Sequence, residues 1–249
     1  MKSESTAKEK LFQTAAGLFY RQGYRATGVD TIAAASGIGK MTLYRHYPSK
    51  DDLIVAYLRD SDEEFWAGFQ QITGGEATAR GKLLAFFAAL QAYAQTPACY
   101  GCPFLNVATE YPEPDHPGHR VALEHKAGVR ARFRQLAAEA GATQPEALAA
   151  ALHLLMDGAY AAARLYNGGA GNPAEHLADA ARLLIDANCP ATPDDGRERL
   201  ARMPLAHSPA RWSSSSRSGP SVPVTINPSG GAAMVAPTFS SAAEMRGAA

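Results

Sequence analysis

The sequence predicts an all-α protein, and three observations support that fold class. Apolar residues in positions 1–190 recur at intervals of three and four residues, which is the period of an α-helix. Alanine and leucine, which favour helices, dominate the same region. Runs of alternating β-branched residues, which would indicate strands, are missing from it. We therefore expect helices throughout and no sheet.

Glycine and proline residues divide this region into about nine helices. The breaks fall at Gly23, Gly37, Pro48, Gly74-Gly75, Thr96-Pro97, the cluster of Pro112, Pro114 and Pro117, Gly141, and the segment 168–173. We expect a three-helix head over residues 4–64 and a larger helical body over residues 65–190. A disordered tail is expected over residues 191–249, because ten serines, seven prolines and few aliphatic residues cannot offset the entropy of ordering. The alternative for the tail is a short peptide that docks on a partner.

Charge is distributed unevenly along a chain whose formal net charge is zero. Residues 1–59 contain nine Lys or Arg and five Asp or Glu, so the head is basic and the remainder is acidic. Three cysteines do not form a disulfide scaffold and suit a reducing compartment. The sequence has neither an apolar stretch of membrane-spanning length nor the apolar core of a signal peptide. We expect a cytoplasmic protein with no membrane partner.

Three short sequences in the head match capping boxes. In a capping box a hydroxyl group caps the helix start, and an acid three residues later faces the first amides. The matches span residues 6–9, 27–30 and 49–52. We expect a helix to begin at each of them, the third running towards Gln70.

A helix-turn-helix unit is predicted between the second and third boxes. Gly37 can adopt the left-handed conformation that a tight turn between two short helices requires. In the second of these helices, residues four positions apart lie on one side, so Leu43 and Tyr47 are expected to face inward. Met41 and Arg45 then lie on the opposite side.

The outward side of this helix carries groups suited to DNA. Arg45 can donate two hydrogen bonds to guanine, while Met41 and Thr42 can contact a thymine methyl group. Lys40 and Lys50 stand at helix starts, where they can reach phosphates. The alternative is a solvated helical hairpin with ordinary surface charges.

The head also contains short sequences typical of one group of regulators. They are Gly23-Tyr24, Ile32-Ala33, Ser36-Gly37 and, above all, the stretch 42–53, which reads Thr-Leu-Tyr-Arg-His-Tyr-Pro-Ser-Lys-Asp-Asp-Leu. Together they closely resemble the N-terminal DNA-binding domain of the TetR (tetracycline-repressor-like) family of bacterial regulators, over about residues 4–64. The resemblance implies DNA contacts by Lys40, Thr42, Tyr44, Arg45, His46 and Lys50, with Tyr44 and Lys50 on phosphates.

Thr27 and Met41 complete the candidate DNA-binding set.

Two features of the head depart from the family pattern. Gly28 stands where the family often has threonine, which removes a potential phosphate contact. Gly39 and Met41 replace commoner small polar residues, so the operator sequence does not follow from the resemblance.

The resemblance further implies a body that forms dimers and encloses a ligand pocket. Two helices rich in alanine and leucine are expected at about 145–167 and 173–188, and their small residues allow close approach of a second helix. The candidate interface residues are Leu148, Leu152, Leu155, Ala159, Ala162, Leu177, Ala180, Ala181, Leu184 and Ile185. We expect a homodimer that reads a near-palindromic duplex site. The alternative for these residues is a plain intramolecular core.

Aromatic residues gather in the middle of the body and form the candidate ligand-binding set. The set is Trp66, Phe69, Phe86, Phe87, Tyr93 and Phe104, with Phe65 and Tyr111 in the same region. Such residues can line a pocket for a small, mainly apolar effector. Aromatic residues at helical spacing also form ordinary cores, and the sequence does not separate the two possibilities.

Cys99 and Cys102 form a Cys-x₂-Cys pair that is followed by His116 and His119. These four residues are potential zinc ligands, although the histidines are closer together than in most zinc sites. Thiol redox sensing and a purely structural role are the other two interpretations, since thiol reactivity depends on a pKa that sequence does not give.

The phosphate-binding, metalloprotease and hydrolase motifs of common enzymes are missing. Cys102 and His116 could imitate a nucleophile and a base, but no third residue is suited to orient them. We therefore expect a transcriptional regulator that is not an enzyme and needs no cofactor. Such regulators are more often repressors than activators, and we expect release from the operator by a small apolar ligand. The alternative is a thiol-redox or metal response through Cys99 and Cys102.

Overall fold

The computed structural model describes residues 2–189 and shows that part of the chain as helices without strands. It contains nine α-helices and one short 3₁₀ helix. This confirms the all-α class and the expected number of helices. The segment 191–249, for which we predicted a disordered tail, lies outside the described residues.

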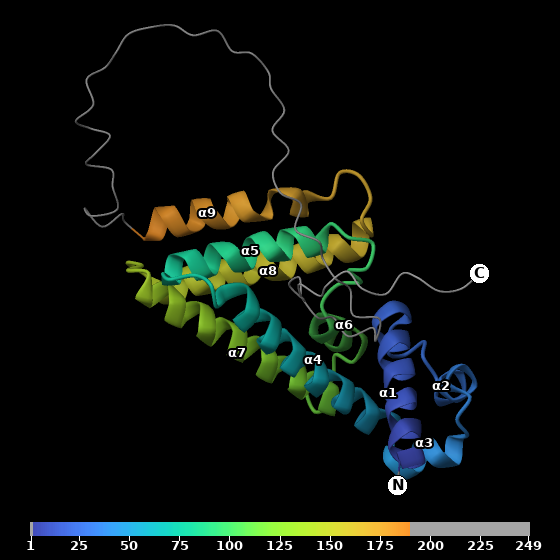
Figure 1. Ribbon diagram of the computed structural model, residues 1–249. Coiled ribbons are helices and arrows are strands. Elements are labelled where there is room, and N and C mark those ends of the chain that lie inside the picture. The colour runs from blue at the N-terminus through green and yellow to red at the C-terminus, as the bar shows by residue number, and fades with distance from the viewer. Residues whose placement is uncertain (1, 190–249) are drawn as a thin grey trace, which may run out of the picture.

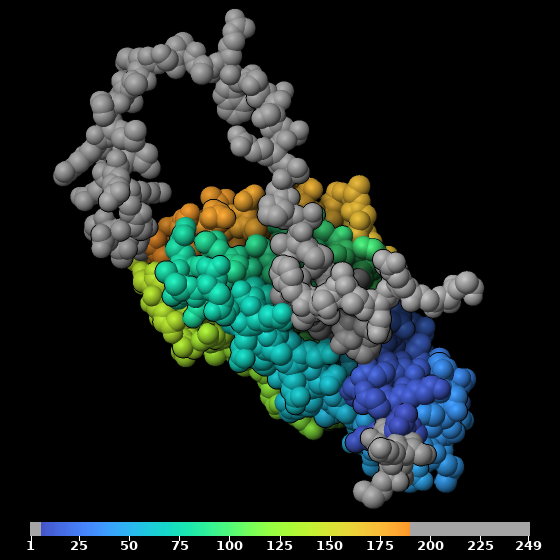
Figure 2. All heavy atoms as spheres, in the orientation of Figure 1, coloured from blue at the N-terminus to red at the C-terminus, as the bar shows by residue number. Residues whose placement is uncertain are grey.

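The head consists of three helices and the first part of a fourth. They are α1 (Lys2–Gln22), α2 (Val29–Ser36), α3 (Lys40–His46) and α4 (Lys50–Thr73). Figure 1 shows α1, α2 and α3 together at one end of the molecule, while α4 runs from them into the body. Leu11, Phe19 and Ile32 are fully buried at the centre of the head. The space-filling view in Figure 2 shows the head, in blue, projecting from the end of the body.

The body is a bundle of long helices with one short helix beside the head. It comprises α5 (Ala79–Ala94), α6 (Pro103–Glu110), α7 (Pro117–Glu139), α8 (Pro145–Tyr166), the 3₁₀ helix η1 (Pro173–His176) and α9 (Leu177–Asn188). α7 packs mainly on α8, α5 on α9, and α4 on both α5 and α7. The short α6 lies between the head and this bundle (Figure 1). A change in the bundle can therefore reach the head through α4 or α6.

One of the three predicted capping boxes forms. At the start of α4, the backbone N–H of Asp52 donates to the Ser49 hydroxyl and that of Ser49 donates to the Asp52 carboxylate, each at 3.0 Å. The box over residues 6–9 is wrong, because α1 already begins at Lys2. The box over residues 27–30 is also wrong: Gly28 is the N-cap of α2, and no side chain caps that helix.

Candidate nucleic-acid interface

The helix-turn-helix unit forms as the sequence predicts. Gly37 ends α2 in the left-handed conformation, with φ of 68°, and its N–H donates to the carbonyl oxygen of Ala34. Gly39 then caps α3, whose inward side carries Leu43, fully buried, with Tyr47 buried directly after the helix. These two anchors fix the rotation of α3 about its axis. They thereby determine which of its side chains face solvent.

The outward side of α3 presents the residues that we selected as candidate DNA readers. Met41 is 85% exposed and Tyr44 is 46% exposed. Arg45 is exposed as well, and Thr42 is half-buried beside them. An apolar thioether, a phenol, a guanidinium group and a hydroxyl group thus share one surface, which suits contacts with base edges and phosphates.

The charged groups around α3 differ in how readily they can meet a phosphate. The ammonium group of Lys40 forms an ion pair with Asp30 of α2, and this contact raises the pKa of Lys40. Lys50 is half-buried at the start of α4, and burial lowers its pKa. His46 is half-buried, and its Nε2 has no hydrogen-bond partner among residues 2–189. Lys40 must exchange Asp30 for a phosphate if it is to bind DNA.

Thr27 does not share this surface. Its side chain is fully buried, and its hydroxyl group donates to the carbonyl oxygen of Gly23 at 2.7 Å. A hydroxyl group that already closes the turn before α2 stabilises the head from within. The structure therefore contradicts our placement of Thr27 among the DNA-contacting residues.

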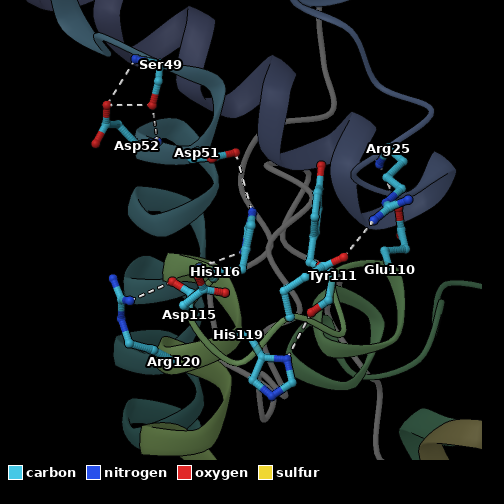
Figure 3. A network of polar contacts seen from close by, with 12 residues as sticks. Arg25, Ser49, Asp51, Asp52, Glu110, Tyr111, Asp115, His116, His119 and Arg120 are labelled. Atoms are coloured by element: carbon cyan, nitrogen blue, oxygen red, sulfur yellow. Dashed lines mark hydrogen bonds and ion pairs between the residues drawn. The ribbon is translucent and has the colours of Figure 1, made fainter.

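The end of α6 holds the turn between α1 and α2. The carboxylate of Glu110 accepts hydrogen bonds from the backbone N–H groups of Tyr24, at 3.0 Å, and Arg25, at 2.6 Å. The guanidinium group of Arg25 lies over the Tyr111 ring, 5.0 Å from its centroid. Figure 3 shows these side chains meeting between the head and the body.

A second contact joins the start of α7 to the start of α4. His116 caps α7, because its Nδ1 accepts from the backbone N–H of Gly118 at 3.1 Å. Its ring stacks on Tyr111, with 4.0 Å between centroids, and its Nε2 lies 3.5 Å from the Asp51 carboxylate (Figure 3). The DNA-binding unit is therefore attached to the body at α6 and at α7.

The segment that leads into α6 and its first residue are also bonded to α1 and the turn after it. The hydroxyl group of Tyr24 donates to the carbonyl oxygen of Pro103 at 2.9 Å, and that of Tyr20 donates to the carbonyl oxygen of Gly101 at 3.2 Å. The Tyr20 hydroxyl also lies 2.8 Å from that of Tyr93 in α5. All three tyrosines are buried, so these bonds are shielded from water.

A small cavity of about 10 Å³ lies between α4, α6, α7 and α8. This volume holds about one water molecule. The lining residues are Ser61, Phe65, Cys102, Pro103, Phe104, His125, Met156 and Tyr160. Of the six predicted ligand-binding residues, only Phe104 borders this cavity.

The other predicted ligand-binding residues lie in the core or beside it. Phe69, Phe86 and Phe87 are buried, and Phe86 packs against the other two with centroid distances of 5.2 and 5.3 Å. Trp66 is half-buried and donates its indole N–H to Asp62 at 3.1 Å. Tyr93 is bonded to Tyr20, as described above. The structure therefore supports the core interpretation for these five residues.

Comparison with known proteins agrees with this architecture. Residues 11–57 match the family model described as bacterial regulatory proteins of the tetR family, and residues 79–180 match the tetracyclin repressor-like C-terminal domain. Together the two matches span more than half of the chain. The crystal structure of SCO4454, a TetR-family transcriptional regulator from Streptomyces coelicolor, is 33% identical, with a TM-score of 0.66 over 74% of this chain and 94% of that chain.

The chain belongs to the TetR family.

Two curated relatives, both described as HTH-type transcriptional regulators or repressors, are similar as well. The transcriptional regulator YjdC of Escherichia coli (strain K12) is 26% identical over 61% of this chain and 80% of its own length. The transcriptional repressor KstR2 of Mycolicibacterium smegmatis is 33% identical over 34% of this chain and 42% of its own length. TetR-family proteins are DNA-binding transcriptional regulators that function as dimers. The predicted class of function, a DNA-binding transcriptional regulator, is confirmed.

An apolar groove of this TetR-family chain lies where we predicted a dimer interface. The groove, of about 230 Å³, runs between α8 and the η1–α9 segment and is lined by Leu154, Gly158, Ala162 and Ala180, among others. Five of the ten predicted interface residues line this groove: Leu155, Ala159, Ala162, Leu177 and Ala180. Four others are buried within their own chain away from the groove lining: Leu148, Leu152, Ala181 and Ile185. The large exposed leucines of α8 and α9 are ones that the sequence analysis did not select: Leu154, Leu165 and Leu183.

The cysteines and histidines do not form the zinc site that we considered. Cys99 and Cys102 are buried thiols, and His119 contacts the carbonyl oxygen of Tyr111. Within the described range, no three His, Cys, Asp or Glu residues come together in a way that could hold a metal ion. Burial raises the pKa of Cys99 to about 11, so very little of its thiolate exists near neutral pH.

The described helices include none that is both long and apolar enough to cross a membrane.

Proposed function

We propose that this TetR-family protein is a dimeric repressor that binds a near-palindromic duplex site and leaves it when a small, mainly apolar molecule binds in the body. One observation carries the DNA-binding part of the proposal. The outer side of α3 is exposed directly opposite two buried anchors, Leu43 and Tyr47. The similarity to the repressor KstR2 supports repression over activation. We place this activity in the cytoplasm.

Within this proposal the residues on α3 have separate roles. Arg45 reads a base, because an exposed guanidinium group can donate two hydrogen bonds to guanine. Met41 and Thr42 make apolar contacts with a thymine methyl group, and Tyr44 binds a phosphate. Lys40 and His46, at the two ends of α3, and Lys50, at the start of α4, add contacts to the phosphate backbone.

The α8–α9 groove supports the dimeric part of the proposal. Leu154 and Leu183 expose most of their side chains on the two helices that border it. Small residues such as Gly158 let a second helix approach closely. A twofold dimer of this kind places two α3 helices against two half-sites, so the operator is expected to be nearly palindromic.

The contacts of α6 support release by a ligand. Phe104, in the first turn of α6, borders the body cavity. The carbonyl oxygen of the preceding residue, Pro103, accepts a hydrogen bond from the Tyr24 hydroxyl of the head. A ligand that prefers a shifted α6 would favour head positions that do not fit the operator. A hundredfold loss of operator affinity requires about 2.7 kcal/mol of coupling between the two sites.

Selection of bound sequences from a random duplex DNA pool tests this function. We expect enrichment of one near-palindromic site whose binding weakens as salt rises. Failure to enrich any sequence, or enrichment of a single unsymmetrical half-site, would contradict the proposal.

A thiol response through Cys99 and Cys102 is the rival mechanism of release, because Cys102 also borders the cavity. Replacing both cysteines with serine separates the two. We expect the double variant to bind the operator and to release it with the same effector as the wild type. A variant that binds DNA normally but no longer responds to peroxide or zinc that releases the wild type would favour the thiol or metal response.

A further inference from the structure

We propose that Glu110 is a positioning residue for operator recognition: its carboxylate holds the DNA-binding head at one angle to the body, so that the dimer accepts only one spacing between half-sites. This inference rests on the proposed binding of a near-palindromic site and specifies what limits the spacing of that site. Three hydrogen bonds between α6 and the turn after α1 provide the geometry.

The Glu110 carboxylate holds two consecutive backbone groups of the head. Its Oε1 accepts from the N–H of Tyr24 at 3.0 Å, and its Oε2 accepts from the N–H of Arg25 at 2.6 Å. Backbone N–H groups in a turn need acceptors, because the turn has no regular hydrogen-bond ladder. Here the body supplies the acceptor, since Glu110 is the last residue of α6. Hydrogen bonds to a charged acceptor are about twice as strong as neutral ones.

The turn is shaped to receive this carboxylate. Gly23, directly before Tyr24, has a φ of +94°, a conformation that glycine adopts readily and other residues rarely do. A Cβ atom at this position would lie 2.7 Å from Oε1 of Glu110, which is too close for two atoms that are not bonded. Glycine therefore forms the turn and also leaves room for the carboxylate (Figure 3).

Both ends of α6 are bonded to the same residue of the head. The hydroxyl group of Tyr24 donates to the carbonyl oxygen of Pro103, the first residue of α6, while the backbone N–H of Tyr24 donates to Glu110, the last. The Tyr24 ring is buried and stacks on Phe19 of α1, with 5.4 Å between centroids. Two attachments at opposite ends of a helix prevent the head from turning, whereas a single attachment would act as a pivot.

α6 is in turn packed as part of the body. Val107, in the middle of α6, is fully buried, and a Cβ atom at Gly118 of α7 would lie 3.0 Å from its Cγ2, so the two helices are in close contact. The side-chain amide of Asn106 donates to the carbonyl oxygen of Tyr100 at 3.1 Å. α4 also joins the head to the body, but a helix joined only at its end can bend. The bonds to α6 therefore determine the angle of the head.

The spacing of the half-sites is sensitive to this angle. One extra base pair at the centre of a palindromic site moves the half-sites apart by about 3.4 Å and rotates one relative to the other by about 35° around the DNA axis. Hydrogen bonds of the N–H···O type span only about 2.7–3.2 Å between heavy atoms. Two heads that keep their bonds to α6 cannot both follow such a change, so they must break the bonds to Glu110.

Operators that differ only in the spacing between half-sites test the inference. Gel-shift titrations of the full-length protein compare the selected operator with versions in which one base pair is added or removed at the centre. We expect the wild type to lose affinity by about thirtyfold or more with either change, because charge-assisted bonds must break. Equal affinity for the three spacings would contradict the inference, because heads that turn freely are not held by a clamp.

A matched pair of variants isolates the clamp. Glu110→Gln keeps the size of the side chain but places an NH₂ group against one of the two N–H donors. We expect it to reduce the loss of affinity caused by an altered spacing by about fivefold or more, while each half-site keeps its base preferences. Reduced stability alone would weaken binding to all three operators alike and leave that loss unchanged, which would contradict the inference.

Glu113→Gln is the control, because it removes the same charge three residues further along the chain. The Glu113 carboxylate faces the guanidinium group of Arg25, 3.9 Å away, and both side chains are exposed. We expect this variant to retain the strict spacing of the wild type. An equal tolerance of altered spacing in both variants would mean that charge, and not the clamp, is responsible.

A measurement without DNA separates this inference from the proposed function. Spin labels at Ala35→Cys on α2 and Ala138→Cys on α7, in chains mixed with excess unlabelled protein, report the distance between head and body. Both positions are exposed, and the three native cysteines are buried. We expect a narrow distance distribution with Glu110 present, including in Glu113→Gln, and a broader one in Glu110→Gln. Equal widths would overturn the inference, whereas the expected widths in a protein that binds no palindromic site would contradict only the proposed function.

Discussion

The hydroxyl group of Tyr24 donates to the carbonyl oxygen of Pro103 at 2.9 Å, which joins the DNA-binding head to the first turn of α6. Both residues are buried. Phe104, the next residue along α6, stacks on His125 at the cavity. A chain of direct contacts thus leads from the cavity to the turn that precedes α2.

The first prediction concerns this bond. We expect Tyr24→Phe to lower the free energy of unfolding by about 1–3 kcal/mol, because the carbonyl of Pro103 loses a buried partner. We also expect operator release to need more ligand, because α6 and the head are less tightly connected. Urea unfolding measures the first effect and effector titration of the DNA complex measures the second. Unchanged release by ligand would show that the signal travels by another route.

The second prediction concerns the ion pair between Lys40 and Asp30. We expect Asp30→Asn to tighten binding to DNA, because Lys40 no longer has to leave a carboxylate to meet a phosphate. The gain should be about twofold to fivefold at low salt and smaller at high salt. Gel-shift titrations at two salt concentrations measure it, with Glu139→Gln on α7 as a control that neutralises a distant acid. Weaker binding by Asp30→Asn would mean that the carboxylate itself positions α3.

The third prediction concerns the α8–α9 groove. Leu183 is 71% exposed on α9, one of the two helices that border the groove, whereas Leu123, which is 57% exposed, lies on α7. We expect Leu183→Arg to be a monomer and Leu123→Arg to remain a dimer, as measured by light scattering. Operator affinity of the monomer should fall by about tenfold or more, because the two half-sites are no longer bound together. A dimeric Leu183→Arg protein would place the interface elsewhere.

The fourth prediction concerns pH. Burial lowers the pKa of His125 in the folded protein to about 4, so the unfolded chain binds the proton more readily between about pH 6.5 and 4. Stability contributed by this residue is therefore present above pH 6.5 and is lost as pH falls, by up to about 1.4 kcal/mol per pH unit.

We expect His125→Gln to show a shallower loss of stability than the wild type over this range in urea unfolding. The difference between the two proteins isolates His125 from other titrating groups, such as Glu64, whose pKa is raised by burial to about 7. Parallel pH profiles would contradict the assigned role of His125.

The DNA-binding head could be predicted largely from sequence because its signals are local. Leu43 and Tyr47 are four residues apart, so the helical period alone places them on one side, and Gly37 marks the turn before them. The capping box of Ser49 is equally local. Thr27 matched the same pattern, but Gly28 adopts the cap conformation and the threonine hydroxyl turns back to Gly23.

The cavity could not be predicted because its polar residues come from distant parts of the sequence. Ser61 and His125 lie on α4 and α7, and neither stands in a motif. The sequence analysis selected aromatic residues by type, yet Phe86 and Phe87 fill the core in place of a pocket. Leu183 was likewise missed, because the residue type alone does not show whether a leucine on an apolar helix faces the core or solvent.

The most direct test of the account compares Arg45→Ala with Lys50→Ala on the selected operator and on each of its single-base variants. We predict that Arg45→Ala loses preference at one base pair of each half-site, at a cost of about 1–3 kcal/mol, because its guanidinium group reads that base. Lys50→Ala should weaken binding to every sequence alike and reduce the salt dependence by about one ion. If Arg45→Ala instead lowered affinity equally for all sequences, α3 would not read bases through Arg45, and the central claim would be contradicted.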